Sequence, residues 1–96
     1  MREKFVVKVS KKFLRDLDEL TPERALAIAK KLKILEIAPL PTGKNRIKKI
    51  RGFVPPLYRL RIGDKRVLYR ISGNQVVLLK IIDRKDLERE LKNLSG

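Results

Sequence analysis

The sequence contains no cysteine and no histidine. The first absence excludes disulfides and a nucleophilic thiol, and the two together remove the usual zinc ligands. The second absence also removes the side chain that most often transfers protons near neutral pH. An enzyme built from this chain must therefore work with lysine, arginine, tyrosine and carboxylates, and no metal site is expected.

Long hydrophobic runs are also missing. No apolar stretch approaches the roughly 18 residues that a membrane-spanning helix needs, and Phe5-Val6-Val7 is too short for the core of a signal peptide. The sequence has no internal repeat, linker or low-complexity segment either. We therefore expect a cytoplasmic protein whose 96 residues form a single domain over 1–96.

Acidic residues are scarce compared with basic ones. The chain has 25 Lys and Arg against 11 Asp and Glu, a formal net charge of +14. So strong a field favours nucleic acid, an acidic protein partner or an anionic membrane surface. Charged residues make up 38% of the chain, which is typical of a thermophile. Ion-pair networks need both signs, however, so heat adaptation does not explain the positive excess.

The most informative segment runs from Leu57 to Arg70, LYRLRIGDKRVLYR. Apolar and basic residues alternate on both sides of Gly63-Asp64, which is a strong signal for a β-hairpin with a two-residue turn. Such a turn fixes the register of the two strands. Arg61 is therefore predicted to lie opposite Arg66, and Tyr58 opposite Tyr69.

This register gives the hairpin an apolar face and a basic face, because side chains alternate along a strand. The apolar face carries Tyr58, Leu60, Val67 and Tyr69, and the basic face carries Arg59, Arg61, Arg66 and Arg70. Like charges directly opposite each other are destabilising unless an anion lies between them. The basic face, called the arginine face below, is therefore a candidate phosphate-binding surface, whereas both tyrosines are predicted core residues.

The segment before the hairpin predicts one strand and two helices. Alternation indicates a strand over about 2–9, and Ser10 is a suitable N-cap for a helix over about 11–20. Thr21-Pro22 begins a second helix over about 22–37, with threonine as N-cap and proline in the first turn. Its apolar stripe consists of Ala25, Ile28, Ala29, Leu32 and Leu35. We expect the two helices to form an αα-hairpin that covers a sheet.

The remaining elements complete the predicted sheet. A short strand is predicted over about 47–51, and the hairpin supplies strands over 57–62 and 65–72. The strand over 76–82 is apolar on both faces except at Lys80, which favours a central position and a bulge. Asp83 is expected to cap a final helix that carries Leu87, Leu91 and Leu94 on one side.

The order of elements predicts an α+β fold, β-α-α-β-β-β-β-α. It consists of a curved antiparallel sheet with the αα-hairpin on the Tyr58/Tyr69 face, and a C-terminal helix. The arginine face should remain partly open. Leu68, Val77 and Leu79 fall among the arginines, so they need a cover from the last helix or from another chain.

Three segments together resemble the RelE/ParE toxins of toxin–antitoxin systems. They are Lys49-Ile50-Arg51-Gly52, the run from Leu57 to Asp64, and Arg66-Val67-Leu68-Tyr69. Length and element order agree with that family, so the resemblance covers nearly the whole chain. It implies a small toxin held inactive by a cognate acidic, RelB-like antitoxin, with no cofactor. RelE-like members cut messenger RNA on the ribosome, whereas ParE-like members inhibit DNA gyrase without cutting RNA.

The resemblance also assigns residues. The RelE-type active site falls on Arg59, Arg61, Arg66 and Arg84. Charge, rather than the resemblance, predicts RNA binding at Lys44, Arg46, Lys48, Lys49, Arg51, Arg70 and Lys85, although the first four could instead hold an acidic antitoxin. Antitoxin binding is expected at Leu68, Val77 and Leu79, which form an apolar patch ringed by positive charge. Family members often end the last strand with a His-Arg-Arg or similar run, followed by a tyrosine. Here the run is Asp83-Arg84-Lys85 and Leu87 stands at the tyrosine position, so the histidine and the tyrosine are both missing.

The general base is therefore unassigned. RNA cleavage without a metal uses the ribose 2′-OH as the nucleophile on the adjacent phosphate. Arginines suit the stabilisation of charge on the phosphoryl oxygens, but arginine at its ordinary pKa is a poor base. The candidates for the base are Lys48, Lys49, Glu88 and Glu90, and the sequence does not distinguish among them.

Two functions stay open from the sequence. The first is a ribosome-dependent messenger RNA endonuclease. The second is a binding protein without catalysis, either an inhibitor of gyrase or a toxin that has lost its chemistry. A plain basic nucleic-acid-binding domain is a third reading, but no glycine-rich phosphate loop, RNP-type aromatic motif or zinc pattern supports it.

Overall fold

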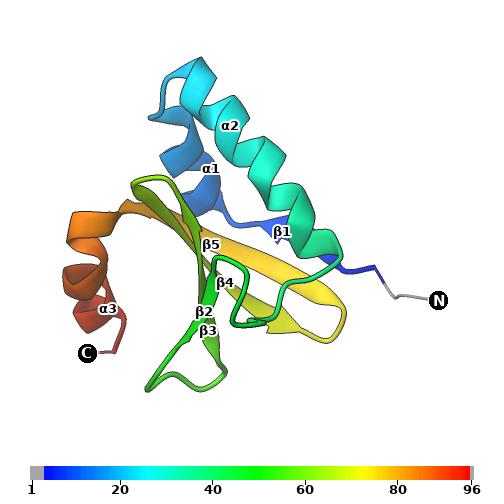
Figure 1. The fold of residues 1–96 in the computed structure, drawn as a ribbon. Coiled ribbons are helices and arrows are strands. Elements are labelled where there is room, and N and C mark those ends of the chain that lie inside the picture. Colours follow the sequence, from blue (N-terminus) through cyan, green and yellow to red (C-terminus); the bar gives the residue numbers. More distant parts are fainter. Residues whose placement is uncertain (1–3, 96) are drawn as a thin grey trace.

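Two helices near the N-terminus cover one face of a five-stranded sheet in the computed structural model, which describes residues 4–95 (Figure 1). The elements are β1 (Val6–Val9), α1 (Lys11–Asp18), α2 (Pro22–Leu32), η1 (Lys33–Glu36), β2 (Ile47–Ile50), β3 (Leu57–Ile62), β4 (Lys65–Ser72), β5 (Gln75–Asp83), η2 (Arg84–Asp86) and α3 (Leu87–Ser95). This confirms the α+β class and the order β-α-α-β-β-β-β-α. The predicted helix over 22–37 is split into α2 and a 3₁₀ turn, and the first two residues of the predicted strand over 2–9 lie outside the described residues.

The hairpin register is the predicted one. Tyr58 lies opposite Tyr69, and Arg61 lies opposite Arg66. Gly63 has a φ of 60°, a left-handed conformation that glycine adopts without steric cost and that this tight turn requires. The hairpin therefore separates its apolar and basic side chains as the alternation indicates.

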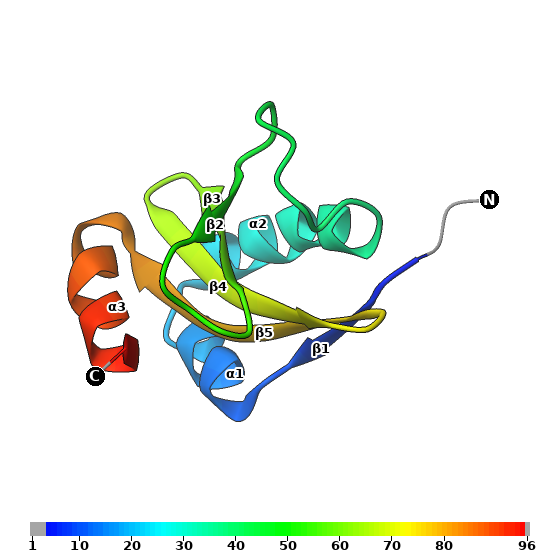
Figure 2. The same ribbon diagram turned by 90° about the horizontal axis from the view of Figure 1, so that it is seen from below.

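The sheet is mixed rather than wholly antiparallel as predicted. Its strand order is β1-β5-β4-β3-β2, and β1 runs parallel to β5 while every other pair is antiparallel. Figure 2 shows the same arrangement from below, with the αα-hairpin connecting β1 to the far edge of the sheet. The alternation of β1 shows that it is a strand but carries no signal for its partner or its direction.

The core lies between the αα-hairpin and the apolar face of the hairpin strands. Phe13, Ile28 and Leu35 from the helical segments pack on Leu60 and Val67 from the sheet, and all are buried. The prediction that the helices cover the Tyr58/Tyr69 face is confirmed. Ala29 of the predicted apolar stripe is exposed instead, because the helix turns its Ile28 side toward the sheet.

Both tyrosines are core residues, as predicted. Their rings stack at a centroid distance of 5.6 Å, an arrangement worth about 0.5–1.5 kcal/mol beyond the buried area. The Tyr69 hydroxyl donates a hydrogen bond of 2.6 Å to the carbonyl oxygen of Pro39. This bond fixes the segment after η1 against the sheet and satisfies the one polar group of the ring.

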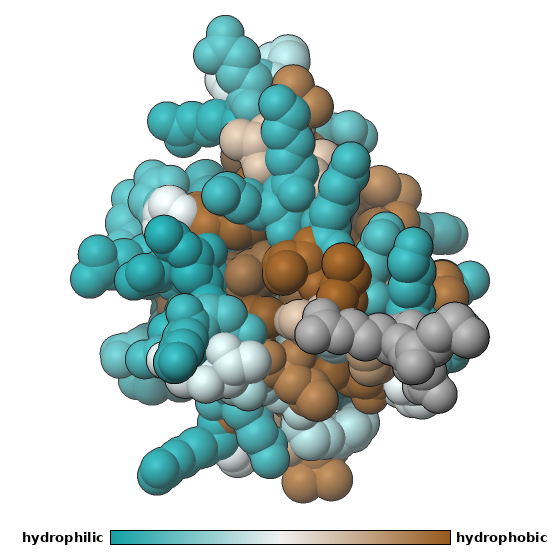
Figure 3. Space-filling view, turned by 45° about the vertical axis from the view of Figure 1, so that its right-hand side comes forward, coloured by the Kyte–Doolittle hydropathy of each residue, from teal (hydrophilic) through white to brown (hydrophobic). Residues whose placement is uncertain are grey.

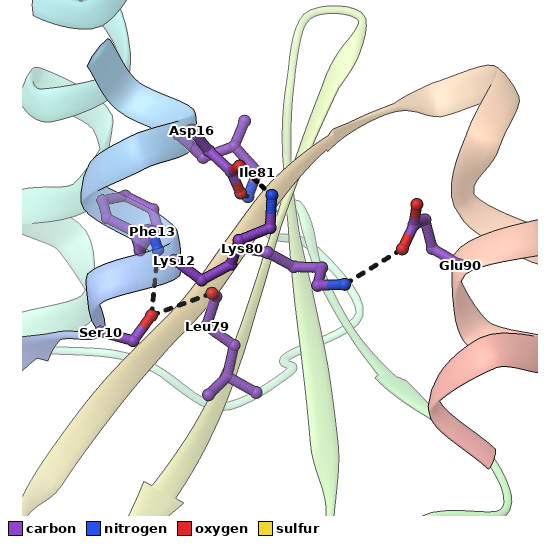
Figure 4. Close-up of polar contacts among 8 residues, drawn as sticks. All are labelled: Ser10, Lys12, Phe13, Asp16, Leu79, Lys80, Ile81 and Glu90. Atoms are coloured by element: carbon purple, nitrogen blue, oxygen red, sulfur yellow. Dashed lines mark hydrogen bonds and ion pairs between the residues drawn. The ribbon is translucent and has the colours of Figure 1, made fainter. Parts of the chain in front are cut away.

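The outer edge of β5 is completed by side chains of α1 and of its N-cap residue, Ser10. Because β1 ends at Val9, opposite Leu78, no strand among residues 4–95 pairs with this edge from Leu79 to Asp83. Ser10 donates to the carbonyl oxygen of Leu79 (3.0 Å), and the buried carboxylate of Asp16 accepts from the backbone N–H of Ile81 (2.9 Å), as Figure 4 shows. The bulge predicted for β5 is present as a register shift in its pairing with β4. Leu68 pairs with Lys80, whereas the next residue, Tyr69, pairs with Leu78.

The start of the C-terminal helix differs from the prediction. Asp83 does not cap a long helix: it is the last residue of β5, and a 3₁₀ turn separates it from α3. Its carboxylate pairs with Lys65 across the sheet instead. The helix α3 lies on the opposite side of β5 from α1 (Figure 4) and is tied to the strand by the Lys80–Glu90 pair at 3.0 Å.

Among residues 4–95, no helix is long and apolar enough to cross a membrane.

Candidate RNA-binding and catalytic site

The arginine face contains a hollow of about 430 Å³ between the hairpin and the segment that follows β5. Its lining consists of Arg59, Arg61, Arg66, Arg84, Lys85, Leu87 and Glu88. The four arginines assigned to the active site from the sequence therefore come together, although they are up to 25 positions apart in the chain. We call this site the arginine hollow.

Arg66 is the most constrained of these side chains. It is only 6% exposed, and its Nη1 donates to the backbone carbonyl oxygens of Gly63 (3.0 Å) and Lys65 (2.9 Å). Within the described chain, no carboxylate forms an ion pair with it. The guanidinium is thus oriented by neutral carbonyl groups and keeps its charge available for an external anion.

The electrostatics of the arginine hollow confirm crowding of positive charge. Burial lowers the pKa of Arg66, and the nearby charges of Arg59, Arg61 and Arg84 lower it further. Burial and the charge of Arg61 also lower the pKa of Arg59. A bound phosphate would relieve this repulsion, because an anion near these groups favours their charged forms. The arrangement therefore suits a phosphodiester better than an uncharged ligand.

Arg84 is held in place by the hairpin turn. Its backbone N–H donates to the carbonyl oxygen of Asp64 (2.8 Å), and the preceding Asp83 pairs with Lys65. These two contacts attach the end of β5 to the start of β4. They explain how a residue beyond the last strand lines the same hollow as the hairpin arginines.

The other residues predicted to bind RNA are dispersed. Lys85 lines the arginine hollow, and Lys48 lies opposite Arg59 in the sheet. Lys44 and Arg46 line a separate groove, Lys49 and Arg51 lie together beside the turn after β2, and Arg70 is on the arginine face but outside the lining of the hollow. The structure therefore gathers the predicted catalytic arginines more closely than the predicted RNA-binding set.

The apolar residues predicted to bind an antitoxin differ in access. Leu68 is fully buried within the chain itself, whereas Val77 and Leu79 are half-buried. The sequence allowed the last helix as one possible cover, and α3 does lie beside β5. Because Leu68 is fully buried, a partner could contact it only if the residues that cover it moved.

A second hollow was not anticipated from the sequence. A groove of about 530 Å³ lies between the end of the αα-hairpin and the strands β2 and β3. Its apolar lining is Ile34, Ile37, Ile47 and Leu60, and its cations are Lys30, Lys31, Lys33, Lys44, Arg46 and Arg61. Ile34 and Ile37 are 45% and 47% exposed. The sequence signal that could have predicted this groove is the end of the predicted second helix, where Ile34 and Ile37 follow a group of lysines.

The comparison with known proteins agrees with this geometry. The family model described as the ParE toxin of the type II toxin–antitoxin system parDE matches residues 7–88. The chain belongs to the RelE/ParE toxin family. A Methanocaldococcus jannaschii protein that bears the name toxin RelE1 is 31% identical over 84 residues, which is 86% of this chain and 92% of that protein.

Solved structures of RelE/ParE toxins have the same fold. The Pyrococcus horikoshii RelE–RelB complex contains a chain with a TM-score of 0.71 and 30% identity, covering 84% of this chain and 96% of that one. The Mycobacterium tuberculosis toxin–antitoxin complex RelBE2 gives a TM-score of 0.72 and 27% identity, covering 84% of this chain and 99% of that one. Relatives of this RelE/ParE toxin have thus been crystallised with antitoxins.

Proposed function

We propose that this chain is a ribosome-dependent messenger RNA endonuclease that inhibits translation and is neutralised by a cognate acidic, RelB-like antitoxin. The observation that carries the proposal is the buried Arg66, which has no carboxylate partner among residues 4–95 and faces three further arginines. Burying a charge without a partner is costly. Selection for an anionic ligand accounts for that cost.

The chemistry follows from the residue types. The ribose 2′-OH attacks the adjacent phosphorus, the bond to the 5′ oxygen breaks, and a 2′,3′-cyclic phosphate and a 5′-hydroxyl result. Negative charge develops on the phosphoryl oxygens, and guanidinium groups placed in advance stabilise it. Arg59, Arg61, Arg66 and Arg84 would supply these groups, because all four line the same hollow. The reaction needs no metal, and the described residues contain no cluster of His, Cys, Asp and Glu suited to one.

The experiment is single-turnover cleavage of a message in purified translating ribosomes, with wild type and Arg66→Ala. We expect Arg66→Ala to bind the message more weakly and to cut it about 10²–10³-fold more slowly, because a positioned charge donor is lost. Arg89→Ala is the matched control, since Arg89 is exposed on α3 and pairs with Asp86 outside the arginine hollow. Robust wild-type cleavage that is unaffected by Arg66→Ala would show that the active site lies elsewhere.

A gyrase inhibitor without nuclease activity is the second candidate. The family model that matches the chain describes a ParE toxin, and the chain lacks both the histidine and the tyrosine discussed above. A supercoiling assay with purified gyrase separates the two functions. Inhibition of supercoiling together with intact messages would support the ParE-like function and reject the endonuclease.

An antitoxin with acidic and apolar residues fits two surfaces of this chain. One is the patch of Val77 and Leu79, and the other is the groove around Ile34 and Ile37, where cations surround apolar side chains. Figure 3 shows apolar side chains gathered on one face of the molecule with hydrophilic side chains projecting around them. Charge complementarity of this kind accelerates association and makes it sensitive to salt.

Coexpression with the product of each adjacent reading frame tests this partner. We expect one small acidic protein to co-purify, and Ile37→Asp or Leu79→Asp to weaken its binding at least about tenfold. Expression of the chain alone should arrest growth. Unimpaired growth and no acidic partner would together remove the support for a toxin that an antitoxin neutralises.

A further inference from the structure

The arginine hollow needs an acid–base group that its arginines do not supply. A guanidinium ordinarily stays protonated, and the chain has no histidine or cysteine. Both tyrosines lie on the opposite face of the sheet, where the Tyr69 hydroxyl donates to Pro39 and burial raises the pKa of Tyr69. The base must therefore come from a lysine or a carboxylate that reaches the arginine face.

Glu88 is the carboxylate in this lining. It shares the hollow with Arg59, Arg61, Arg66 and Arg84 and is exposed to solvent. Its place in the first turn of α3 is set by the 3₁₀ turn η2, which the Arg84 N–H attaches to the hairpin turn. Position, exposure and neighbours thus place Glu88 where a phosphodiester would bind.

The ion pairs of this region distinguish Glu88 from the other carboxylates. Asp83 pairs with Lys65, Asp86 with Arg89 at 3.0 Å, and Glu90 with Lys80 at 3.0 Å. Over the part of the chain that the structure describes, Glu88 forms no ion pair. Three of the four carboxylates between positions 83 and 90 therefore have a cation of their own, and the remaining one lines the hollow.

We propose that Glu88 is the general base of the arginine hollow, an inference that rests on the proposed endonuclease function. Its carboxylate takes the proton of the ribose 2′-OH as the oxygen forms a bond to phosphorus. The electron pair of the breaking bond leaves on the 5′ oxygen, which receives a proton from water. Deprotonation of Glu88 by solvent then restores the carboxylate.

The other candidates for the general base are less well placed than Glu88 or less ready to accept a proton. Glu90 is engaged with Lys80 and lies in a different hollow, and Lys49 lies beside the turn after β2. Lys48 and Lys85 are near the arginines, but an ammonium group must lose a proton before it can act as a base. A carboxylate is already a base at neutral pH.

The test measures single-turnover cleavage in purified translating ribosomes for wild type, Glu88→Gln, Glu88→Ala and Glu90→Gln. We expect Glu88→Gln to cut about 10²–10⁴-fold more slowly while binding the message as tightly as wild type or more so. Added formate should partly restore the rate of Glu88→Ala, since a small carboxylate can enter the space that the side chain leaves. Glu90→Gln, the matched control on the same helix, should stay within a few-fold of wild type.

The outcomes separate this inference from the function on which it rests. Wild-type cleavage that Arg66→Ala abolishes and Glu88→Gln leaves unchanged would overturn the role of Glu88 and keep the endonuclease. A slow Glu88→Ala variant that formate does not accelerate would make Glu88 structural and also overturn the proposal. A wild-type protein that cuts no message would reject both.

Discussion

The two faces of the central hairpin both contain buried side chains, but they differ in how their polar groups are satisfied. On the helix-covered face, Val67 and Tyr69 are completely buried, and the Tyr69 hydroxyl donates a hydrogen bond to the carbonyl oxygen of Pro39. On the arginine face, Arg66 is almost as buried, yet it forms no ion pair within residues 4–95 and donates its hydrogen bonds to backbone carbonyl groups. The first face gains stability from burial, whereas the second retains repulsion that a ligand would relieve.

This difference shows how one secondary structure can serve two purposes. A period of two assigns successive residues to opposite faces, so Leu60 and Arg61 experience unlike environments although they are neighbours in sequence. Fold stability and ligand binding are thereby separated onto different sides of the same strands. Substitutions on the helix-covered face should change the stability of the fold, and substitutions on the arginine face should change ligand binding and cleavage.

The largest effect should come from exchanging the character of the two faces. Leu60→Arg places a charge in the apolar core, where Leu60 is 4% exposed, and should lower the free energy of unfolding by about 4 kcal/mol or more. Arg61→Leu, its matched partner, should leave stability within about 1 kcal/mol of wild type because Arg61 is exposed. Urea denaturation measures both, and the reverse ranking would contradict the assignment of the faces.

A smaller loss of stability is expected at the join between α1 and the sheet. Asp16→Ala leaves the backbone N–H of Ile81 without its acceptor, which should cost about 1–3 kcal/mol. Asp18→Ala, on the exposed side of the same helix, should change stability by no more than about 0.5 kcal/mol. Equal midpoints of thermal unfolding for the two variants would show that the Asp16 contact is unimportant.

A gain of function should be available on the arginine face. Leu87 lines the arginine hollow, so Leu87→Tyr should bring a phenol that can protonate the leaving 5′ oxygen and raise the cleavage rate about tenfold. Binding of the message should change little. Leu87→Phe has nearly the same size without the hydroxyl, and an equal gain in that variant would attribute the effect to packing rather than to proton transfer.

The smallest expected effect is the pH dependence of the Lys65–Asp83 pair. The hydrogen bond from Lys65, with its charge, lowers the pKa of Asp83 below its ordinary value. The pair therefore stabilises the fold above the unfolded pKa of aspartate, and this contribution is lost as the pH falls through the lower, folded value. Because the carboxylate is 38% exposed, we expect only about 0.2–1 kcal/mol at neutral pH.

Thermal unfolding of wild type and Asp83→Asn between about pH 2.5 and 6 measures this contribution. The two proteins should differ near the upper end of the range and converge at the lower end. A difference that grows as the pH falls would have the wrong sign and would reject the role given to Lys65.

Much of the fold could be predicted because its strongest signals are local. Alternation around Gly63-Asp64 determines which residues pair across the hairpin, and Ser10 and Thr21 act as the expected N-caps, accepting from Phe13 and Arg24. The parallel pairing of β1 with β5 could not be predicted. It joins residues about 70 positions apart, and the local sequence of either strand does not indicate its partner. The predicted cap at Asp83 is wrong because the carboxylate pairs with Lys65, which is also remote in sequence.

The candidate site divides in the same way. Arg59, Arg61 and Arg66 could be placed on one face from the hairpin alone, but the position of Arg84 depends on its bond to the Asp64 carbonyl. Glu88 and Glu90 look equivalent in the sequence, two positions apart on one helix. Only the three-dimensional packing shows that one faces the arginines while the other is paired with Lys80.

The order of the strands also bears on self-association. The two outermost strands, β1 and β2, are four residues each, whereas the inner strands β4 and β5 have eight and nine. Open strand edges recruit other chains into aggregates, and short edges and exposed lysines are common defences. Lys48 and Lys49 are exposed on β2, and side chains of Ser10 and Asp16 occupy the stretch of β5 that β1 leaves uncovered. The longest apolar strands of this toxin are thus shielded from intermolecular β-pairing even when no antitoxin is bound.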